Sequence, residues 1–303
     1  MRIFLTGATG FLGSAIVSEL IDAGHQVIGL ARSDTAATSL RAAGVTVHRG
    51  DVEDLESLRR GVAASDGVIH TAFIHDFSKY RENCEIDRRA IETLGSSLEG
   101  SDRPLIVTSG TGMVAPGRLG TENDEAVPSS RGLPRSASEE AGSSLASRGV
   151  HVSVVRLPQV HDRAKQGLIS SLIAVAREKR VSAYVGDGRN RWPAVHRLDA
   201  ACLYKLSLEK RSPRARYHAV AEEGVPARDI AEAIGRGLNI PVVSLSPGQA
   251  SEHFGWLGMF IGLDMPASSA LTREQLGWQP THTGLVDDLN HARDFTVQQT
   301  LHA

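Results

Sequence analysis

The sequence predicts an α/β fold in which a doubly wound parallel sheet carries a smaller α+β cap formed by the C-terminal half. Three observations predict this fold. Short apolar stretches alternate with amphipathic helical stretches over the first 156 residues, which is typical of consecutive βαβ units. The short stretches are apolar nearly throughout, as expected for strands whose sheet is covered on both faces. Beyond residue 156 the alternation loosens, which indicates a separate, smaller unit.

The strands and helices of the first half are expected to alternate regularly. The predicted strands are residues 2–5, 26–31, 46–49, 67–70, 105–108 and 151–156. The predicted helices are residues 11–23, 35–43, 54–63, 83–99 and 134–148. In the first of these helices, Leu12, Ile16 and Leu20 recur at helical spacing and form one apolar face.

The second half is expected to mix helices with short strands and loops. Its predicted helices are residues 167–179, 199–208, 227–238 and 272–276. Residues 272–275 are Thr, Arg, Glu and Gln, which fits a capping box, and Gly277 is a typical helix stop. Residues 110–132 are rich in Gly, Pro, Ser, Asn and Asp, which predicts a long loop of the kind that often carries function.

The composition excludes several classes of protein. The chain has 33 Lys and Arg against 35 Asp and Glu, a net charge of -2, whereas a nucleic-acid-binding surface needs a basic excess. Cys84 and Cys202 lie far apart without metal-ligand spacing, so neither a disulfide framework nor a metal site is expected. No apolar stretch approaches the ~18 residues of a membrane helix. We expect a cytoplasmic protein with a small-molecule substrate, no nucleic-acid or membrane partner, and a homodimer as one of its assemblies.

A glycine-rich loop carries the strongest functional signal. It joins the first predicted strand to the first predicted helix, which is the context that such a motif requires. Gly7 permits the tight turn, Gly10 lets the backbone approach a pyrophosphate, and Gly13 lets the helix pack closely. Unpaired N–H groups at the helix start then face the anion; a turn without a ligand is the alternative. The expected cofactor contacts are Gly7, Thr9, Gly10, Phe11, Leu12 and Gly13.

The G-x-x-G-x-x-G spacing resembles that of the short-chain dehydrogenase/reductase superfamily. The form Gly-Ala-Thr-Gly-Phe-Leu-Gly resembles its extended and atypical, epimerase/dehydratase-like branch, and the resemblance extends over nearly the whole chain. It implies a Rossmann-type sheet with a bound nicotinamide dinucleotide. It also implies a dinucleotide-binding domain over residues 1–165 and a mainly substrate-binding cap over residues 166–303, with residues 187–220 returning to the first domain.

The end of the second predicted strand indicates NADP(H) rather than NAD(H). NAD sites usually carry an acidic residue there, which holds the ribose hydroxyls. Here the strand is followed by Arg32 and Ser33, and a guanidinium and a hydroxyl suit a 2′-phosphate. Asp34 is the competing acidic residue, two positions late, and a solvated turn is the alternative role of Arg32.

The resemblance assigns further cofactor contacts to the carboxyl ends of the later strands, where open α/β sheets bind their ligands. It implies adenine contacts from Asp51 and Val52, contacts to the middle of the cofactor from Thr71, Ala72 and Phe73, and a nicotinamide flanked by Thr108, Pro158 and Val160.

The chain departs from the superfamily's usual catalytic pair, a Tyr-x-x-x-Lys on the helix after the fifth strand. No tyrosine occurs between residues 81 and 183. Arg135 stands at the tyrosine position and Glu139 at the lysine position, and Asp87 replaces an asparagine expected on the preceding helix. Arginine stays protonated, so it is a poor general acid, but it can donate hydrogen bonds to a developing oxyanion. A weak surface ion pair between Arg135 and Glu139 is the alternative interpretation.

Hydroxyls and histidines near the strand ends are the remaining catalytic candidates. Thr111 and Ser109 follow the fifth strand and are expected to hold the substrate oxygen, as the superfamily's Ser/Thr does. His75 after the fourth strand and His161 after the sixth are candidate general acids, because histidine titrates near neutral pH. For each histidine, a hydrogen-bonded loop residue is the alternative.

Two segments of the second half have candidate roles. Residues 186–199 resemble a G-x-G-x-x-R-x-x-x-H-V-x-D stretch of the extended branch. We expect Asp199 to cap the next helix, His196 to be structural, and Arg191 and Trp192 to line the substrate site. Residues 251–263 are rich in apolar and aromatic side chains, which either wall the substrate site or pack within the cap or against a second copy.

These observations favour an NADPH-dependent oxidoreductase that reduces a carbonyl or related C=N group of a small molecule. A nucleotide-sugar epimerase or dehydratase is the second hypothesis, and it normally needs the missing Tyr and Lys. A non-catalytic NADP-binding redox sensor is the third.

Overall fold

A seven-stranded parallel sheet forms the larger part of the computed structural model, which describes residues 1–131, 133–292 and 295. The strand order is β10-β6-β5-β4-β1-β2-β3, and every neighbouring pair is parallel. The order reverses between β1 and β4, and this switch point is where open α/β sheets bind ligands. The strands are β1 (Arg2–Thr6), β2 (Gln26–Ala31), β3 (Thr46–Arg49), β4 (Gly67–His70), β5 (Leu105–Gly110), β6 (Val152–Leu157) and β10 (Arg216–His218).

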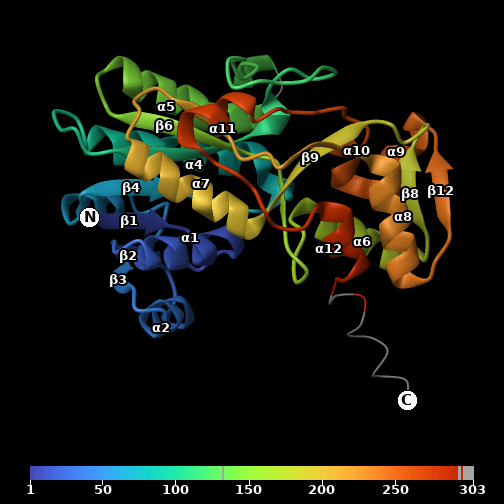
Figure 1. The fold of residues 1–303 in the computed structure, drawn as a ribbon, viewed down its shortest axis with the longest axis horizontal. Helices are drawn as coiled ribbons and strands as arrows, with labels where there is room; N and C mark the ends of the chain where they lie inside the picture. The colour runs from blue at the N-terminus through green and yellow to red at the C-terminus, as the bar shows by residue number, and fades with distance from the viewer. Residues whose placement is uncertain (132, 293–294, 296–303) are drawn as a thin grey trace.

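Helices cover both faces of this sheet (Figure 1). One face packs against α1 (Phe11–Asp22), α2 (Asp34–Ala42) and α7 (Arg197–Lys210), and the other against α3 (Leu55–Ala63), α4 (Tyr80–Ser96) and α5 (Ala137–Ser147). Side chains along β1 alternate between the two cores: Ile3 and Leu5 lie in one, and Phe4 lies in the other. Because both faces are covered, apolar residues are needed at every strand position. The predicted Rossmann-type fold is confirmed.

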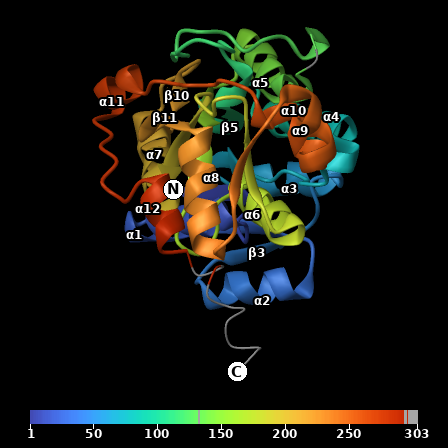
Figure 2. The same cartoon turned by 90° about the vertical axis from the view of Figure 1, so that its right-hand side faces the viewer.

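The cap lies beyond one end of the main sheet, and Figure 2 shows it facing the viewer. Its small parallel sheet consists of β8 (Ser182–Val185) and β12 (Val242–Leu245). A second small sheet has three strands, β7 (Gln159–His161), β9 (Arg191–His196) and β11 (Glu222–Pro226). Because β7 directly follows β6 in sequence, this sheet lies next to the end of the main sheet along the chain. The cap helices are α6 (Leu168–Lys179), α8 (Ala227–Leu238), α9 (Pro247–Phe254), α10 (Gly258–Ile261) and α12 (Leu285–Asn290).

Most elements lie close to their predicted bounds. Strands β2, β3 and β4 have the predicted bounds, whereas α4 begins at Tyr80, three residues early. After the end of β5, the described residues of the predicted loop 110–132 contain short 3-10 helices and an isolated β-bridge from Gly120 to Ala267. Gly132 lies outside the described residues. The remaining elements are α11 (Ala270–Leu276) and the 3-10 helices η1 (Phe77–Lys79), η2 (Thr111–Met113), η3 (Ser129–Arg131), η4 (Pro134–Ser136) and η5 (Gly255–Leu257).

The predicted capping box at Thr272 is wrong. Helix α11 begins at Ala270, and Ser269 precedes it without a capping hydrogen bond from its side chain. The Thr272 hydroxyl instead donates to the buried carboxylate of Glu122 at 2.6 Å. A tertiary partner therefore replaced the local one. Gly277 ends α11 with φ +63°, as predicted.

The predicted capping of α7 by Asp199 is also wrong. The residue before the helix is His196, and its Nδ1 accepts the Leu198 N–H at 3.2 Å. Asp199 lies inside the first turn, and its carboxylate accepts the N–H groups of Thr281 and His282 at 3.0 and 3.1 Å. It therefore ties the C-terminal segment to α7.

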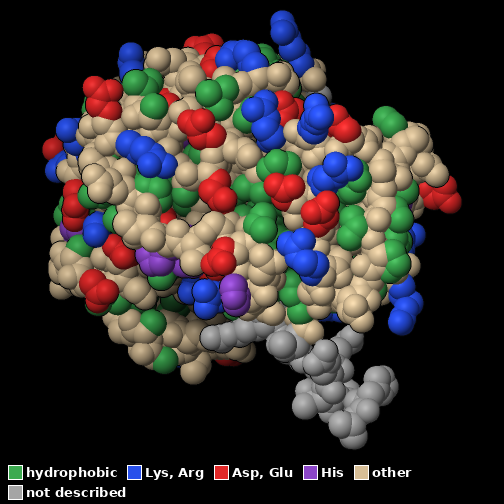
Figure 3. Space-filling view, turned by 45° about the vertical axis from the view of Figure 1, so that its right-hand side comes forward, with side chains coloured by type: hydrophobic (Ala, Val, Ile, Leu, Met, Phe, Trp, Pro, Cys, Tyr) green, Lys and Arg blue, Asp and Glu red, His purple; other side chains and the backbone are tan. Residues whose placement is uncertain are grey.

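Charges of both signs are mixed on the surface. In Figure 3, Lys and Arg side chains lie among Asp and Glu side chains over the visible face, in agreement with the net charge of -2. None of the helices in the described part of the chain has both the length and the apolar character needed to cross a bilayer.

Candidate cofactor and substrate site

The turn between β1 and α1 requires its glycines. Gly7 has φ +75°, and a Cβ there would lie 2.7 Å from Thr71 Oγ1 and 2.8 Å from the Ala72 nitrogen. The Gly7 carbonyl oxygen accepts the Gly10 N–H at 2.8 Å, and a Cβ on Gly13 would collide with the same oxygen. Only glycine therefore permits this turn and the close approach of α1 to it.

The start of α1 offers an anion-binding site. The first hydrogen bond into the helix runs from the Ser14 N–H to the Gly10 carbonyl at 3.0 Å. The N–H groups of Phe11, Leu12 and Gly13 have no acceptor among the described residues. No side chain caps this end, and the first turn contains no acidic residue. The positive end of a 12-residue helix is thus open, which fits the pyrophosphate of a dinucleotide.

Two arginines lie where the ribose phosphate is expected. Arg32 is exposed and has no hydrogen bond or ion pair to any described residue. Ser33 accepts the Ala36 N–H at 3.1 Å and so caps α2. Arg49, at the end of β3, donates to the Ser33 carbonyl at 2.5 Å and to the Asp34 carboxylate at 2.7 Å. The competing acid is therefore already paired, by an arginine that sequence reasoning missed and that the β2–β3 pairing places there.

The other predicted cofactor contacts lie in the loops after β1, β3, β4 and β6, except Val160, which lies in β7. All of them are at least partly exposed, and they are Thr9, Asp51, Val52, Thr71, Ala72, Phe73, Pro158 and Val160. Thr71 Oγ1 donates to the Thr6 carbonyl at 2.8 Å, which joins the β4 loop to the glycine loop. Because the strands are parallel, these loops share the carboxyl edge of the sheet.

The hydroxyls predicted near the substrate are buried. Thr108 Oγ1 donates to the His70 carbonyl at 2.7 Å, and Ser109 donates to Glu139 at 3.1 Å. Thr111 Oγ1 lies 3.5 Å from a backbone carbonyl of β6. All three threonine and serine side chains are less than a tenth exposed. A catalytic role for Ser109 and Thr111 stays a prediction.

Arg135 is held beside the end of β5 by a buried carboxylate. Its Nη1 donates to Asp87 Oδ2 at 2.8 Å and also contacts the Ser138 hydroxyl. Its Nη2 donates to the Thr108 carbonyl at 3.1 Å, and the guanidinium carbon lies 4.4 Å from the centroid of the Phe73 ring. A fixed positive charge therefore stands among the residues expected around the nicotinamide.

A buried chain of hydrogen bonds continues from Asp87 to the glycine-loop strand. Asp87 Oδ1 lies 3.0 Å from His70 Nε2, and His70 Nδ1 lies 2.8 Å from Thr6 Oγ1. All three residues are less than 5% exposed. Burial alone raises the pKa of Asp87, but Arg135 and His70 lower it below its ordinary value, so the carboxylate stays ionised at neutral pH.

Glu139 is buried and paired with Arg156 rather than with Arg135. Arg156 Nε donates to Glu139 Oε2 at 3.0 Å, and its Nη2 donates to Oε1. Arg156 is fully buried on β6, with Nη1 3.1 Å from His218 Nε2. The alternative of a surface ion pair between Arg135 and Glu139 is wrong, because each side chain has another buried partner.

His75 lies between two aromatic rings after β4. Its ring centroid is 5.3 Å from that of Phe73 and 6.2 Å from that of Phe77. Desolvation by its neighbours lowers the pKa of His75, and the cations Arg135 and Lys165 lower it further. The imidazole is therefore mostly neutral at pH 7, and the residue remains exposed.

Sequence reasoning missed two cations beside the glycine loop. Lys165 Nζ lies 5.8 Å from the centroid of the Phe11 ring. Arg197 lies 5.0 Å from the same centroid and donates to the Phe11 carbonyl at 3.3 Å. They come from the loop after β7 and from the start of α7, and no sequence pattern links either of them to residue 11.

His161 is enclosed, unlike His75. It is fully buried, and its Nδ1 lies 2.8 Å from Asp288 Oδ2 of α12. Nearby, His196 stacks on His282 with ring centroids 4.6 Å apart. Within the described residues, no group of three or more His, Cys, Asp and Glu side chains is placed to hold a metal ion.

The predicted cap residues divide between the cap core and its surface. Trp192 is buried in the cap, and Arg191 forms an ion pair with Asp264 at 2.8 Å. In residues 251–263, Met259 is exposed, while Trp256 is 36% exposed and stacks on Phe77. The Trp256 and Phe77 centroids are 4.2 Å apart with an interplanar angle of 8°. The segment thus contacts the loop after β4.

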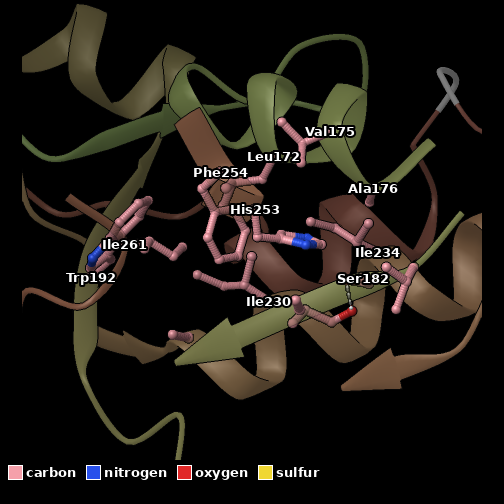
Figure 4. Close-up of a pocket in the computed structure, with 14 residues that line it drawn as sticks. Leu172, Val175, Ala176, Ser182, Trp192, Ile230, Ile234, His253, Phe254 and Ile261 are labelled. Atoms are coloured by element: carbon pink, nitrogen blue, oxygen red, sulfur yellow. Dashed lines mark hydrogen bonds between the residues drawn. The ribbon is translucent and has the colours of Figure 1, made fainter. Parts of the chain in front are cut away.

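The cap core contains a small cavity (Figure 4). Its walls come from α6, α8 and α9, with Leu172, Ile230 and Phe254 around the His253 ring. The cavity volume is about 10 Å³, room for about one water molecule. It is far too small for a substrate, which must bind elsewhere.

Comparison with known proteins identifies a family and a fold. Residues 3–220 match the family model described as "NAD dependent epimerase/dehydratase family". An uncharacterized protein of Schizosaccharomyces pombe is 53% identical over 95% of this chain and 98% of its own length. Sterol-4-alpha-carboxylate 3-dehydrogenase (decarboxylating) of Dictyostelium discoideum is 26% identical over 75% of this chain and 73% of its length. The crystal structure of Thermus thermophilus UDP-glucose 4-epimerase complexed with NAD has a TM-score of 0.76 at 20% identity, covering 98% of this chain and 100% of that one.

Proposed function

The chain belongs to the NAD dependent epimerase/dehydratase family, and from that premise we propose that it is an NADP(H)-dependent oxidoreductase that reduces a carbonyl or related C=N group of a small molecule. One observation carries this proposal: His75 and Arg135 both contact Phe73, directly after β4. The same loop touches the glycine turn, because Gly7 lies against Thr71. A proton donor and a fixed cation therefore adjoin the expected cofactor site.

NADP(H) is supported by the residues around the end of β2. Arg32 has free donors, and Arg49 ion-pairs with Asp34, the acid that would otherwise compete for ribose hydroxyls. Guanidinium groups bind phosphate oxygens through paired, charge-assisted hydrogen bonds. A 2′-hydroxyl offers them no negative charge, so NAD(H) gains less from this surface.

The chain's own side chains supply what carbonyl reduction needs besides a hydride. A bound nicotinamide supplies the hydride to the carbonyl carbon; the oxygen takes up a proton, and the ketone becomes an alcohol. Arg135 donates to the oxygen as negative charge develops on it. His75 delivers the proton, directly or through a water molecule. Thr111 and Ser109 are secondary donors that require a different rotamer.

The lowered pKa of His75 has a consequence for the pH dependence of the reduction. Its protonated form is populated mainly below neutral pH. If His75 is the acid, kcat for reduction rises as the pH falls below neutral.

A nucleotide-sugar epimerase or dehydratase is the second candidate. It is favoured by the family and by the likeness to the fold of UDP-glucose 4-epimerase. Such a reaction takes a proton from the substrate and returns it. Arginine at position 135 cannot do so, because its guanidinium stays protonated.

The test is an NADPH-oxidation assay with aldehydes, ketones and imines, together with quantification of the reduced product. We expect consumption of one NADPH per product formed. We expect kcat to fall about a hundredfold in His75→Gln, with Arg131→Gln, an exposed arginine of η3, unchanged. Tight NADPH binding without any turnover would favour the sensor, and isomerised nucleotide sugar without net NADPH oxidation would favour the epimerase.

A further inference from the structure

The guanidinium of Arg135 has hydrogen-bond donors that the protein leaves unused. An arginine side chain carries five N–H donors. Three are used here: those on Nη1 reach Asp87 and Ser138, and one on Nη2 reaches the Thr108 carbonyl. The Nε–H and the second Nη2–H have no acceptor among the described residues, and the side chain is 14% exposed. Two donors on one planar group match two oxygens of a planar ligand.

The position of these two donors is fixed from the interior of the sheet. Nη1 of Arg135 is hydrogen-bonded to Asp87, Asp87 to His70, and His70 to Thr6. Thr6 ends β1 and His70 ends β4, so the guanidinium is tied to the two strands that flank the switch point. A group held in this way loses little conformational freedom when it binds a ligand.

The charges around Arg135 favour a ligand with a single negative charge. Asp87 neutralises Arg135, and the imidazole of His75 is mostly neutral because of its lowered pKa. Lys165 adds a positive charge: it lowers the pKa of His75, and its Nζ has no ion-pair partner among the described residues. Because Nζ also lies beside the glycine turn, where the cofactor pyrophosphate is expected, little positive charge is left for the ligand. A carboxylate suits these surroundings better than a phosphate dianion.

Aromatic side chains extend from Arg135 to the cap. The Phe73 ring lies 6.4 Å from that of Tyr80, and Phe77 stacks on Trp256 at 4.2 Å. Trp256 lies 6.3 Å from Phe260 across an edge-to-face contact. These rings suit an apolar or aromatic ligand body. They also lower the local dielectric, which strengthens hydrogen bonds to Arg135.

We propose that the substrate is a 2-oxo acid with an apolar or aromatic body, bound through the two free donors of Arg135. One donor binds a carboxylate oxygen and the other binds the adjacent carbonyl oxygen, while the body lies against Phe77 and Trp256. This assignment rests on the proposed oxidoreductase function and adds its substrate class. Reduction adds a hydride to the carbonyl carbon and a proton from His75 to the oxygen, which yields a 2-hydroxy acid.

The first experiment measures binding without turnover. N-phenyloxamate is an unreactive planar analogue of an aryl 2-oxo acid, and its carboxamide is the neutral match. Both are titrated calorimetrically into the protein saturated with NADP⁺. The wild type and Arg131→Gln should bind the acid at least about tenfold more tightly than the amide. Arg135→Gln should lose that preference, and Lys165→Gln should weaken acid binding about threefold.

Several results would overturn the proposal. They are equal affinity for acid and amide, no binding of the acid by the wild type, or an acid preference that survives Arg135→Gln. Because Arg135→Gln leaves Asp87 without its cation, its thermal midpoint is measured alongside. If Arg135→Gln does not fold, two measurements decide whether the carboxylate is recognised. They are the ratio of acid to amide affinity in the wild type and the acid affinity of Lys165→Gln.

A turnover assay separates this inference from the proposed function. Benzoylformate and its methyl ester are compared as substrates with NADPH. A kcat/KM at least about tenfold higher for the acid supports the inference. Faster reduction of the ester overturns it and leaves the oxidoreductase intact. If neither benzoylformate nor its methyl ester is reduced while N-phenyloxamate still binds through Arg135, the result contradicts the proposed oxidoreductase function. It does not contradict the proposed carboxylate site.

Discussion

Replacing Glu139 by alanine should destabilise the protein strongly. Glu139 accepts two hydrogen bonds from Arg156, which is 0% exposed, and one from Ser109. Glu139→Ala removes both acceptors and leaves a guanidinium without a counter-charge in the core. Breaking a buried pair in this way costs about 3–5 kcal/mol. Since folded domains are stable by only about 5–15 kcal/mol, the variant should lose about a fifth or more of its free energy of unfolding.

Urea denaturation followed by tryptophan fluorescence measures this loss. The matched control is Glu56→Ala, because Glu56 also pairs with an arginine, Arg59, but both side chains are more than half exposed. That variant should change the free energy of unfolding by less than about 1 kcal/mol. The double variant Glu139→Leu/Arg156→Met should be more stable than Glu139→Ala, because it removes the buried charge together with its partner.

The same pair predicts what happens when a lysine replaces Glu139. In Glu139→Lys an ammonium replaces the carboxylate beside Arg156, so two cations meet in the core. This variant should be less stable than Glu139→Ala. The reasoning is refuted if Glu139→Ala costs less than about 1 kcal/mol, or if Glu139→Lys unfolds at the wild-type urea concentration.

Three further predictions follow from the structure. In Gly13→Ala the new methyl collides with the Gly7 carbonyl; we expect a loss of about 1–3 kcal/mol in stability and weaker NADPH binding by calorimetry, and unchanged affinity would contradict the close approach of α1 to the glycine turn. Burial, and then the charge of Arg156, lower the pKa of His218 to about 4. Its contribution to stability is therefore complete above the unfolded-state pKa of about 6.5 and declines between about 6.5 and 4, by up to ~1.4 kcal/mol per pH unit; urea midpoints at several pH values test this, and a His218→Gln variant with the same acid sensitivity would exclude the residue. Arg32→Ala should raise the Kd for NADPH at least about tenfold and barely change that for NADH; an equal effect on both coenzymes would remove the 2′-phosphate contact.

The glycine loop and the main sheet could be predicted from sequence because their determinants are local. Gly7, Gly10 and Gly13 lie within seven consecutive residues, and the conformations that they permit follow from the missing Cβ. The apolar strands follow from burial on both faces. The starts of α7 and α11 could not be predicted, because Asp199 and Thr272 bond to residues far along the chain.

The contacts made by side chains of the candidate site could be predicted only in part. The sequence placed Arg135 and Glu139 four residues apart on one helix, and a helix-surface pair was then a reasonable alternative. In the structure this helix packs against the main sheet. Arg135 therefore reaches Asp87 on α4, whereas Glu139 reaches Arg156 on β6. Sequence patterns contain no information about Lys165, because a lone lysine in a loop has no periodicity.

The sequence by itself determined that this chain forms a parallel sheet with an uncapped helix start after a glycine turn, because backbone conformation depends on neighbouring residues. Only the tertiary structure decided which charges neutralise one another. Asp87 lies 48 positions from Arg135, and Glu139 lies 17 positions from Arg156. Side chains so far apart in sequence meet only through strand order and helix packing, and ionic interactions depend on the resulting distance and burial.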